Sequence, residues 1–368
     1  MSLELAEIIQ AIEEVAHPSL QENYDNSGLI VGNTSQIINS ALLCLDCTPE
    51  VVLEAIEKGC NLVISHHPIV FSGLKRFNGK TYVERAIQLA IKHDVALYAC
   101  HTNLDNVLHN GVNHEIASKL GLIQHRVLSP KKNTLLKLSV SVPFDYKEAV
   151  EQAIFNAGGG HIGNYKNCGF TWTGEGTFLP QTGANPFDGT LNEFSKIEEQ
   201  KFEVVFPYYL KRKVLEAMVD AHPYEEVAHE LVALENEVKS IGSGLICEFR
   251  EPIPQSEFLE HLKKSMELET FKYTRSDKEM IHRVAICGGS GAFLIANAKQ
   301  ENCDAYITAD VKYHEFFDAE NQLLLCDIGH FESEKYTVST FAEILSKKFP
   351  NFATIFAQTI TNPVQYYT

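Results

Sequence analysis

The stretch Leu62-Val63-Ile64-Ser65-His66-His67-Pro68 is an apolar run that leads into two adjacent histidines and is closed by a proline. The apolar run predicts a buried strand, and Pro68 ends it because proline has no N–H to donate to a sheet. Neutral imidazole is the metal ligand that proteins use most often. We therefore interpret the pair His66-His67 as the start of a metal site at the end of a strand.

Two further apolar runs end in side chains of the same kind, one before His101 and Asp105 and the other before His330 and Glu334. Because ligands of open α/β sheets gather beyond the carboxyl ends of the strands, we expect the three strand ends to meet. His330 and Glu334 are four residues apart, so both lie on one face of a helix. This mixture of imidazole and carboxylate without thiolate suits Zn, Fe, Mn or Ni.

The adjacency of His66 and His67 argues for two metal ions. Neighbouring side chains on a strand point to opposite sides, so one small ion does not suit both rings. Two ions about 3.5–4 Å apart would lower the pKa of a bound water enough to supply hydroxide at neutral pH. Our hypothesis assigns His67 and Asp105 to one ion, His66 and His330 to the other, and Glu334 as a bridge. The alternative is that these are separate strand-end residues.

Other polar residues receive supporting roles. His101 is expected to orient Asp105 or a bound water, and His101 and Glu334 are the candidates for proton transfer. Asp310 and His314 share a helical face, where they would contact substrate or support the ligands, or merely cap and solvate the helix. The glycines of Gly288-Gly289-Ser290-Gly291 form either a phosphate-binding turn or a tight structural turn.

Composition excludes several classes of protein. A formal charge of −17 and a pI near 5.3 disfavour binding to nucleic acid or anionic membranes. The chain has no run of about 18 apolar residues, so we expect no membrane span. The acidic, amphipathic N-terminus does not resemble a signal peptide. Nine cysteines, most of them within apolar runs, indicate reduced thiols and predict a cytoplasmic location.

The order of the predicted elements indicates a body interrupted by an insert. Short apolar strands alternate with helices in residues 1–128 and again in 238–368, which predicts an α/β body with mixed and parallel sheets. Residues 129–237 instead read strand, helix, two strands, helix, strand, the order of a ferredoxin-like α+β domain. At 368 residues the chain is long enough for both. The predicted fold class is therefore a discontinuous α/β body with an α+β insert.

Four stretches resemble signature segments of the GTP cyclohydrolase I type 2 homologue family, the Nif-three-like dinuclear-metal proteins. They are Ser65-His66-His67-Pro68, His101-Thr102-Asn103-Leu104-Asp105, residues 307–314 and residues 329–334. A departure is Ala309, where the family pattern leads us to expect Gly. The insert resembles the nitrogen-regulatory-PII-like domain of longer bacterial members at Gly160–Tyr165, Gly183–Pro186 and Ala221–Glu226.

The resemblance implies a toroidal homohexamer with zinc, iron or similar ions facing an inner cavity, and an insert that caps the openings of the ring. It implies metal ligands at His66, His67, Asp105, His330 and Glu334. Three functions remain open. The first is a metal-dependent hydrolase of a nucleotide-like or cyclic C–N small molecule, as in GTP ring opening. The second is a dinuclear phosphoesterase, and the third is a non-enzymatic metal-binding or regulatory assembly.

Overall fold

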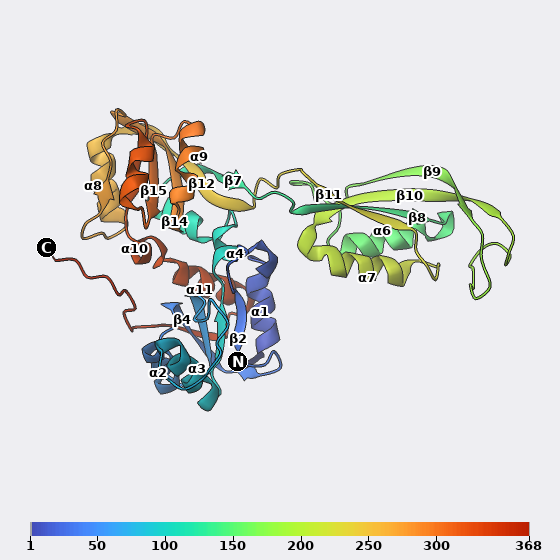
Figure 1. The fold of residues 1–368 in the computed structure, drawn as a ribbon, viewed down its shortest axis with the longest axis horizontal. Coiled ribbons are helices and arrows are strands. Elements are labelled where there is room, and N and C mark those ends of the chain that lie inside the picture. Colours follow the sequence, from blue (N-terminus) through green and yellow to red (C-terminus); the bar gives the residue numbers. More distant parts are fainter. Residues whose placement is uncertain (1, 368) are drawn as a thin grey trace. The chain divides into compact units, whose positions relative to one another are not determined.

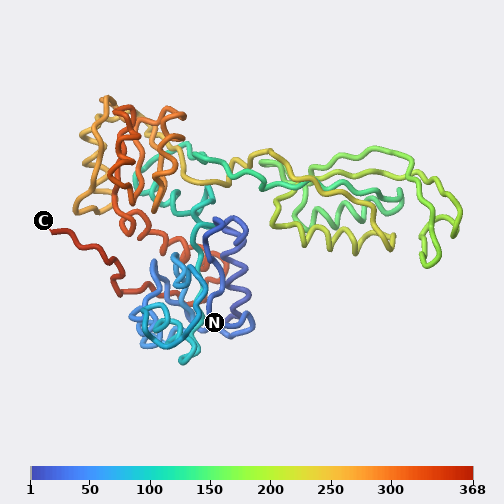
Figure 2. The backbone as a smooth tube through the Cα atoms, in the orientation of Figure 1, coloured from blue at the N-terminus to red at the C-terminus, as the bar shows by residue number. Residues whose placement is uncertain are grey.

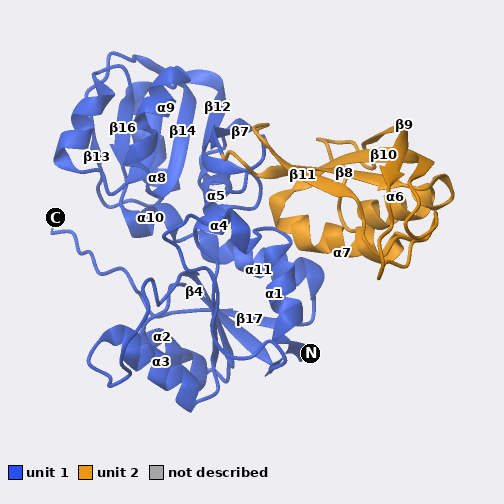
Figure 3. Cartoon of the chain, turned by 45° about the vertical axis from the view of Figure 1, so that its right-hand side comes forward, with its two compact units in different colours: residues 1–130, 239–368 blue, residues 131–238 orange. Residues whose placement is uncertain are grey.

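The computed structural model describes residues 2–367, and its internal contacts divide the chain into two compact units (Figure 3). Residues 1–130 and 239–368 form the first unit, and residues 131–238 form the second. The first and last parts of the chain are therefore interleaved in one body. The strand β17 (Ala353–Phe356) shows this directly, because it pairs in parallel with β4 (Ser40–Asp46) from the other end of the chain (Figure 2).

The first sheet of unit 1 has five strands in the order β17-β4-β5-β6-β2, all parallel except the last. Helices cover both of its faces (Figure 1). Leu42 and Cys44 pack with α2 and α3, whereas the Tyr98 hydroxyl reaches Glu13 of α1 on the opposite face. The further elements are β5 (Leu62–His67), β6 (Ala96–Ala99), β2 (Gly28–Val31), α1 (Leu5–Glu13), α2 (Pro49–Glu57), α3 (Tyr82–Lys92) and α11 (Thr337–Lys348).

The second sheet of unit 1 has six strands in the order β13-β16-β15-β14-β12-β7. Only β14, β15 and β16 are mutually parallel, so the sheet is mixed, as we predicted. The segment around His314 was expected to be a helix and is a 3-10 helix. The elements are β7 (Ile123–Pro130), β12 (Gly242–Pro254), β13 (Lys272–Tyr273), β14 (Met280–Ser290), β15 (Ala305–Ala309), β16 (Leu324–Asp327), α5 (Val112–Lys119), α8 (Gln255–Ser265), α9 (Ile295–Gln300) and η5 (Tyr313–Ala319).

Unit 2 contains a four-stranded antiparallel sheet in the order β11-β8-β10-β9, with two helices that pack on one face. Its chain order is strand, helix, strand, strand, helix, strand, the order of a ferredoxin-like fold. The core between sheet and helices is apolar and includes Leu138, Phe202 and Met218. The elements are β8 (Leu135–Val142), α6 (Lys147–Asn156), β9 (Gly169–Phe178), β10 (Ser195–Pro207), α7 (Lys211–Ala221) and β11 (His229–Leu234).

Two short helices of unit 1 matter most for the site. α4 (Thr102–Asp105) directly follows β6, and α10 (His330–Glu334) follows β16. No helix within residues 2–367 is both long and apolar enough to cross a membrane. The remaining short elements are β1 (Leu3–Glu4) paired with β3 (Ile37–Ile38), and the 3-10 turns η1 (Pro18–Leu20), η2 (Phe144–Tyr146), η3 (Tyr208–Leu210) and η4 (Ala292–Leu294).

Candidate metal centre

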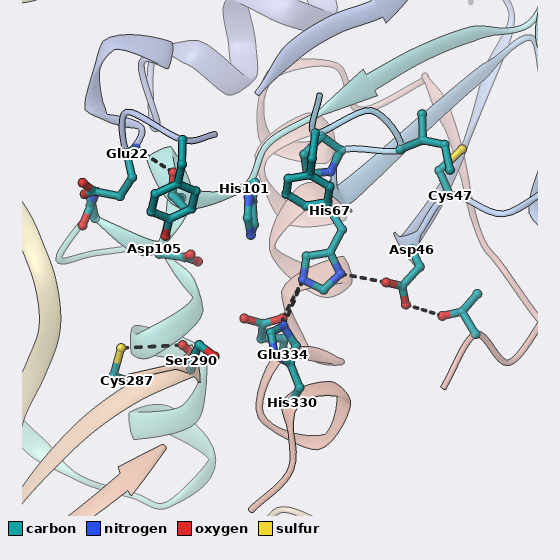
Figure 4. A pocket seen from close by; sticks show the side chains of 18 of the residues that line it. Glu22, Asp46, Cys47, His67, His101, Asp105, Cys287, Ser290, His330 and Glu334 are labelled. Atoms are coloured by element: carbon teal, nitrogen blue, oxygen red, sulfur yellow. Dashed lines mark hydrogen bonds and ion pairs between the residues drawn. The ribbon is translucent and has the colours of Figure 1, made fainter. Parts of the chain in front are cut away.

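The carboxyl ends of β5 and β6 in the first sheet and of β16 in the second sheet meet in one cluster of histidines and carboxylates (Figure 4). β5 delivers His66 and His67, and the turn after β6 delivers Asp105 on α4. α10 carries His330 and Glu334 one helical turn apart. The two sheets of unit 1 therefore each contribute part of the site.

His66 is fully buried and has one ring nitrogen free to face the cluster. Its Nδ1 lies 2.9 Å from the carbonyl oxygen of Cys100, so Nδ1 donates and Nε2 keeps its lone pair. Nε2 lies 3.6 Å from Oδ1 of Asp105 and 3.8 Å from Oε1 of Glu334. Burial lowers the pKa of His66 to about 4, so the ring is neutral at pH 7, the form that binds metal ions.

His67 and His330 form a second group around the other oxygen of Glu334. Oε2 lies 2.9 Å from Nε2 of His67 and 3.1 Å from Nε2 of His330, and the two ring nitrogens are 3.3 Å apart. Behind them, Nδ1 of His67 lies 2.7 Å from Asp46, and Nδ1 of His330 lies 2.6 Å from Asp310. A carboxylate behind a histidine fixes the ring and its tautomer, as in many metal sites.

Glu334 thus faces two groups, one through each oxygen. The grouping differs from our expectation, because the structure brings His66 to Asp105 and His67 to His330. The reason is the alternation of side chains along β5, which turns His66 toward α4 and His67 toward α10 and the end of β4.

Three buried polar atoms in this cluster have no hydrogen-bond partner among residues 2–367. They are Nε2 of His66, Oδ1 of Asp105 and Oε2 of Glu334. The oxygens of Glu334 face the imidazole nitrogens as ion-pair contacts. An unsatisfied buried polar atom costs about 1–3 kcal/mol. A divalent cation would satisfy these nitrogen and oxygen atoms together, so the residues fit a metal ion.

The pKa values of the cluster also support a metal site. Burial raises the pKa of Asp105 well above its usual range, and the charge of Glu334 adds to this. Burial works against protonation of His67, but its contacts with the carboxylates of Asp46 and Glu334 outweigh it and raise its pKa to about 10. Similar contacts raise the pKa of His330 to about 9 against the effect of burial. A divalent cation would displace such protons, so binding should release them.

His101 lies beside both groups. Its ring centroid is 5.2 Å from those of His66 and His67, and the ligand atoms of these three residues lie within 4.8 Å of one another. Its Nδ1 lies 2.8 Å from Oδ1 of Asp25, a residue that also accepts hydrogen bonds from Thr102. Asp25 thereby holds His101 with its other ring nitrogen toward the cluster. A second group within the same distance consists of His67, His330 and Glu334.

A cavity of about 670 Å³ opens onto the cluster. Four aromatic residues with exposed rings line it, namely Tyr24, Phe71, Tyr82 and Phe293. The polar lining is acidic, with Glu22, Asp46, Asp105 and Glu334. Within residues 2–367 no Lys or Arg lines the cavity.

Gly288 and Gly289 lie near the end of β14, where its pairing with β15 is irregular, and they pack against Glu334. A Cβ atom on Gly289 would lie 2.3 Å from Oε1 of Glu334, and Gly289 has a φ of +64°, which suits only glycine well. The amide of Gly288 donates to Asn113 and that of Gly289 to Ser333, so neither is available to a phosphate. Residues 288–290 therefore form the irregular end of a strand, and the glycines leave room for Glu334.

Two supporting carboxylates were not predicted from the sequence. His314 is exposed, stacks on Phe317 and lies outside the residues that line the cavity, which is the solvated position that the sequence left open as its alternative. Asp46 is the last residue of β4. The β4–β5 register pairs it with His67, and that pairing was the signal available from parallel strands. Asp25 lies in a turn, and no spacing linked it to His101.

The fold and this cluster define an α/β protein with His and Glu groups that could hold a metal ion. The chain belongs to the Duf34/NIF3 (NGG1p interacting factor 3) family, whose model matches residues 3–363, so the predicted family is confirmed. It is 39% identical over 325 residues to the "GTP cyclohydrolase 1 type 2 homolog" of Halalkalibacterium halodurans, covering 88% of this chain and 87% of that protein.

Two further relatives cover nearly the whole chain. The protein of the same name from Bacillus subtilis is 35% identical over 367 residues, which is 98% of each chain. The crystal structure of a Bacillus cereus protein related to NIF3 matches with a TM-score of 0.83 at 36% identity, over 99% of each chain. The predicted α/β fold class is confirmed by this likeness.

Proposed function

We propose that the chain binds two divalent metal ions and hydrolyses a small cyclic C–N substrate of nucleotide-like chemistry. The observation that carries the proposal is the position of Glu334, which is 2% exposed and turns one oxygen to His66 and the other to His67 and His330. His66, Asp105 and Glu334 would hold one ion, and His67, His330 and Glu334 the other. Zn, Fe, Mn or Ni suits these ligands.

When bound, such ions act as Lewis acids and supply hydroxide from water at neutral pH. The chain's own residues orient the ligands, exclude bulk water and transfer protons. Asp46 and Asp310 fix the rings of His67 and His330, and the buried walls keep bulk water away from Glu334. Held by Asp25, His101 presents its second ring nitrogen where it can take a proton from water and return one to a leaving nitrogen.

The lining of the cavity favours C–N hydrolysis over phosphoester hydrolysis, the second candidate. Exposed aromatic rings such as Phe71 and Tyr24 offer stacking surfaces to a planar ring. Phosphoryl transfer uses Arg, Lys or metal ions to hold the phosphate oxygens, and among the described lining residues no Lys or Arg shares this task. The names of the relatives, which include GTP cyclohydrolase 1, agree with ring opening of a purine-like base.

We further propose a homohexameric ring in which residues 131–238 act as a PII-like cap. The family resemblance supports this assembly, and light scattering of the purified protein would test it. We also place the protein in the cytoplasm, because all nine cysteines are free and eight of them are buried. The third candidate, a non-enzymatic assembly, requires the same metal site without turnover.

The test is to load the protein with Mn²⁺, Fe²⁺ or Zn²⁺ and incubate it with GTP and, separately, with a generic phosphodiester. Formate release from GTP supports the proposal, whereas phosphate ester cleavage supports the second candidate. His101→Gln should abolish formate release and retain metal binding. The matched control is His314→Gln, an exposed histidine away from the cavity, which should keep full activity. Metal binding without either product would favour the non-enzymatic assembly.

A further inference from the structure

The segment formed by residues 357–367 follows β17 and runs past the metal cluster. Its start is anchored on the first sheet, where the amide of Ala357 donates to the Leu43 carbonyl. The amides of Gln358 and Thr359 and the Thr359 hydroxyl then donate to the carboxylate of Glu54. The segment is therefore docked before it reaches the site.

At the site the segment contacts a residue that supports a candidate metal ligand. The hydroxyl of Thr361 donates to Oδ2 of Asp46 at 2.6 Å, while Oδ1 of Asp46 lies 2.7 Å from Nδ1 of His67. Each oxygen of Asp46 thus has one partner, and the plane of the carboxylate is fixed between them. The side chain of Asp46 is 32% exposed, so without Thr361 it would be free to turn toward water.

The same segment also contacts α10, the helix that follows β16 of the second sheet. The side-chain amide of Asn362 donates to Oε1 of Glu332, which lies on α10 between His330 and Glu334. Thr361 and Pro363 line the cavity, and Pro363 also lines a neighbouring hollow of about 620 Å³ beside His330. The segment therefore contacts both Asp46, which supports His67, and α10, which carries His330 and Glu334.

We propose that Thr361 is a positioning residue of the metal centre, which acts through Asp46 to set the orientation of the His67 ring. Its consequence for metal binding rests on the proposed function, but the hydrogen-bond relay from Thr361 to His67 exists without a metal ion. Direct partners of metal-ligating histidines typically change affinity about 10–100-fold when removed. Thr361 is one step further away, so we expect about a 3- to 10-fold effect on one ion.

The experiment uses the full chain with ¹⁵N-labelled histidine and compares Thr361→Val, Thr361→Ser and Thr359→Val. Thr361→Val removes the hydroxyl that binds Asp46, and Thr361→Ser keeps it. Thr359→Val removes a hydroxyl of the same segment that binds Glu54 and does not touch Asp46. The first readout is the pair of imidazole nitrogen signals of His67 in metal-free protein, assigned by their loss in His67→Gln. The second is Mn²⁺ affinity by calorimetry.

The relay predicts that the His67 signals shift in Thr361→Val and stay in place in Thr361→Ser and Thr359→Val. It also predicts a 3- to 10-fold weaker affinity for one of the two ions in Thr361→Val alone. Unchanged His67 signals in Thr361→Val, or equal shifts in Thr359→Val, would overturn the proposal. A shift of the His67 signals in a protein that binds no metal would support the relay and refute the proposed function.

Discussion

Substitution of Gly289 by alanine should damage the metal centre through a single methyl group. The new Cβ would lie 2.3 Å from Oε1 of Glu334, about 1 Å closer than the 3.4 Å at which ordinary contact begins. To avoid this collision Glu334 would have to turn away from the nitrogens of His67 and His330, which lie 2.9 Å and 3.1 Å from its Oε2. Metal–ligand distances tolerate only about 0.2 Å, so we expect at least about a 10-fold loss of metal affinity.

A second consequence of this substitution is backbone strain, which a matched control can separate. Alanine in the left-handed region costs about 1–2 kcal/mol, and this applies to Gly289 at φ +64° and equally to Gly121 at φ +66°. No atom lies within 4 Å of a Cβ on Gly121, so Gly121→Ala carries the strain without the collision. In thermal or urea unfolding, Gly289→Ala should therefore lose at least as much stability as Gly121→Ala.

Calorimetric titration with Mn²⁺ or Zn²⁺ then separates the effect of the collision on metal binding from the effect of backbone strain. Gly121→Ala should bind metal as the wild type does, and Gly289→Ala should bind at least 10-fold more weakly. Wild-type affinity and stoichiometry in Gly289→Ala would show that Glu334 does not need the space beside Gly289 to bind the metal ions.

Three other predictions concern the support of the site and the fold. Asp46→Asn should weaken the binding of one metal ion by about 10–100-fold in calorimetry, because a neutral amide oxygen accepts the Nδ1 proton of His67 more weakly than a carboxylate. Wild-type affinity would contradict this. Burial works to raise the pKa of Glu54, but hydrogen bonds from Lys58, Thr359 and the backbone outweigh it and lower the pKa to about 2. Because the folded pKa lies below the ordinary 4.5, this stabilisation is complete above pH 4.5 and is lost as the pH falls toward 2. The free energy of unfolding of Glu54→Gln should accordingly fall about 1–3 kcal/mol below that of wild type at pH 7, with the gap narrowing at pH 3. Tyr306→Phe leaves the buried carbonyl of Gly291 without its donor and should cost about 1–2 kcal/mol in urea unfolding, whereas the exposed Tyr313→Phe should cost nothing measurable.

The sequence predicted the strands and the ligand-bearing ends well because both are local. The apolar run before His66 forms β5, and a helical turn does place His330 and Glu334 on one face. The mixed nature of the second sheet was harder to foresee in detail. β12 and β14 are long antiparallel strands with bulges, and no short turn marks their pairing because α8 lies between them.

Local sequence patterns did not predict which candidate ligands lie next to each other. The pairing of His66 with Asp105 and of His67 with His330 depends on which way each side chain turns in three dimensions. Likewise, Thr361 reaches Asp46 across 315 positions of sequence. Contacts of this kind depend on tertiary packing, which spacing along the chain does not encode.

The dinuclear site is tested most simply by counting bound metal in the wild type and in two variants, by calorimetry combined with elemental analysis. We expect two ions per chain in the wild type. His66→Ala should lose one of them, and Glu334→Gln should weaken both, because each oxygen of Glu334 serves a different group. A wild type that binds no metal, or a Glu334→Gln variant that retains both ions at wild-type affinity, would contradict a two-ion site shared by Glu334.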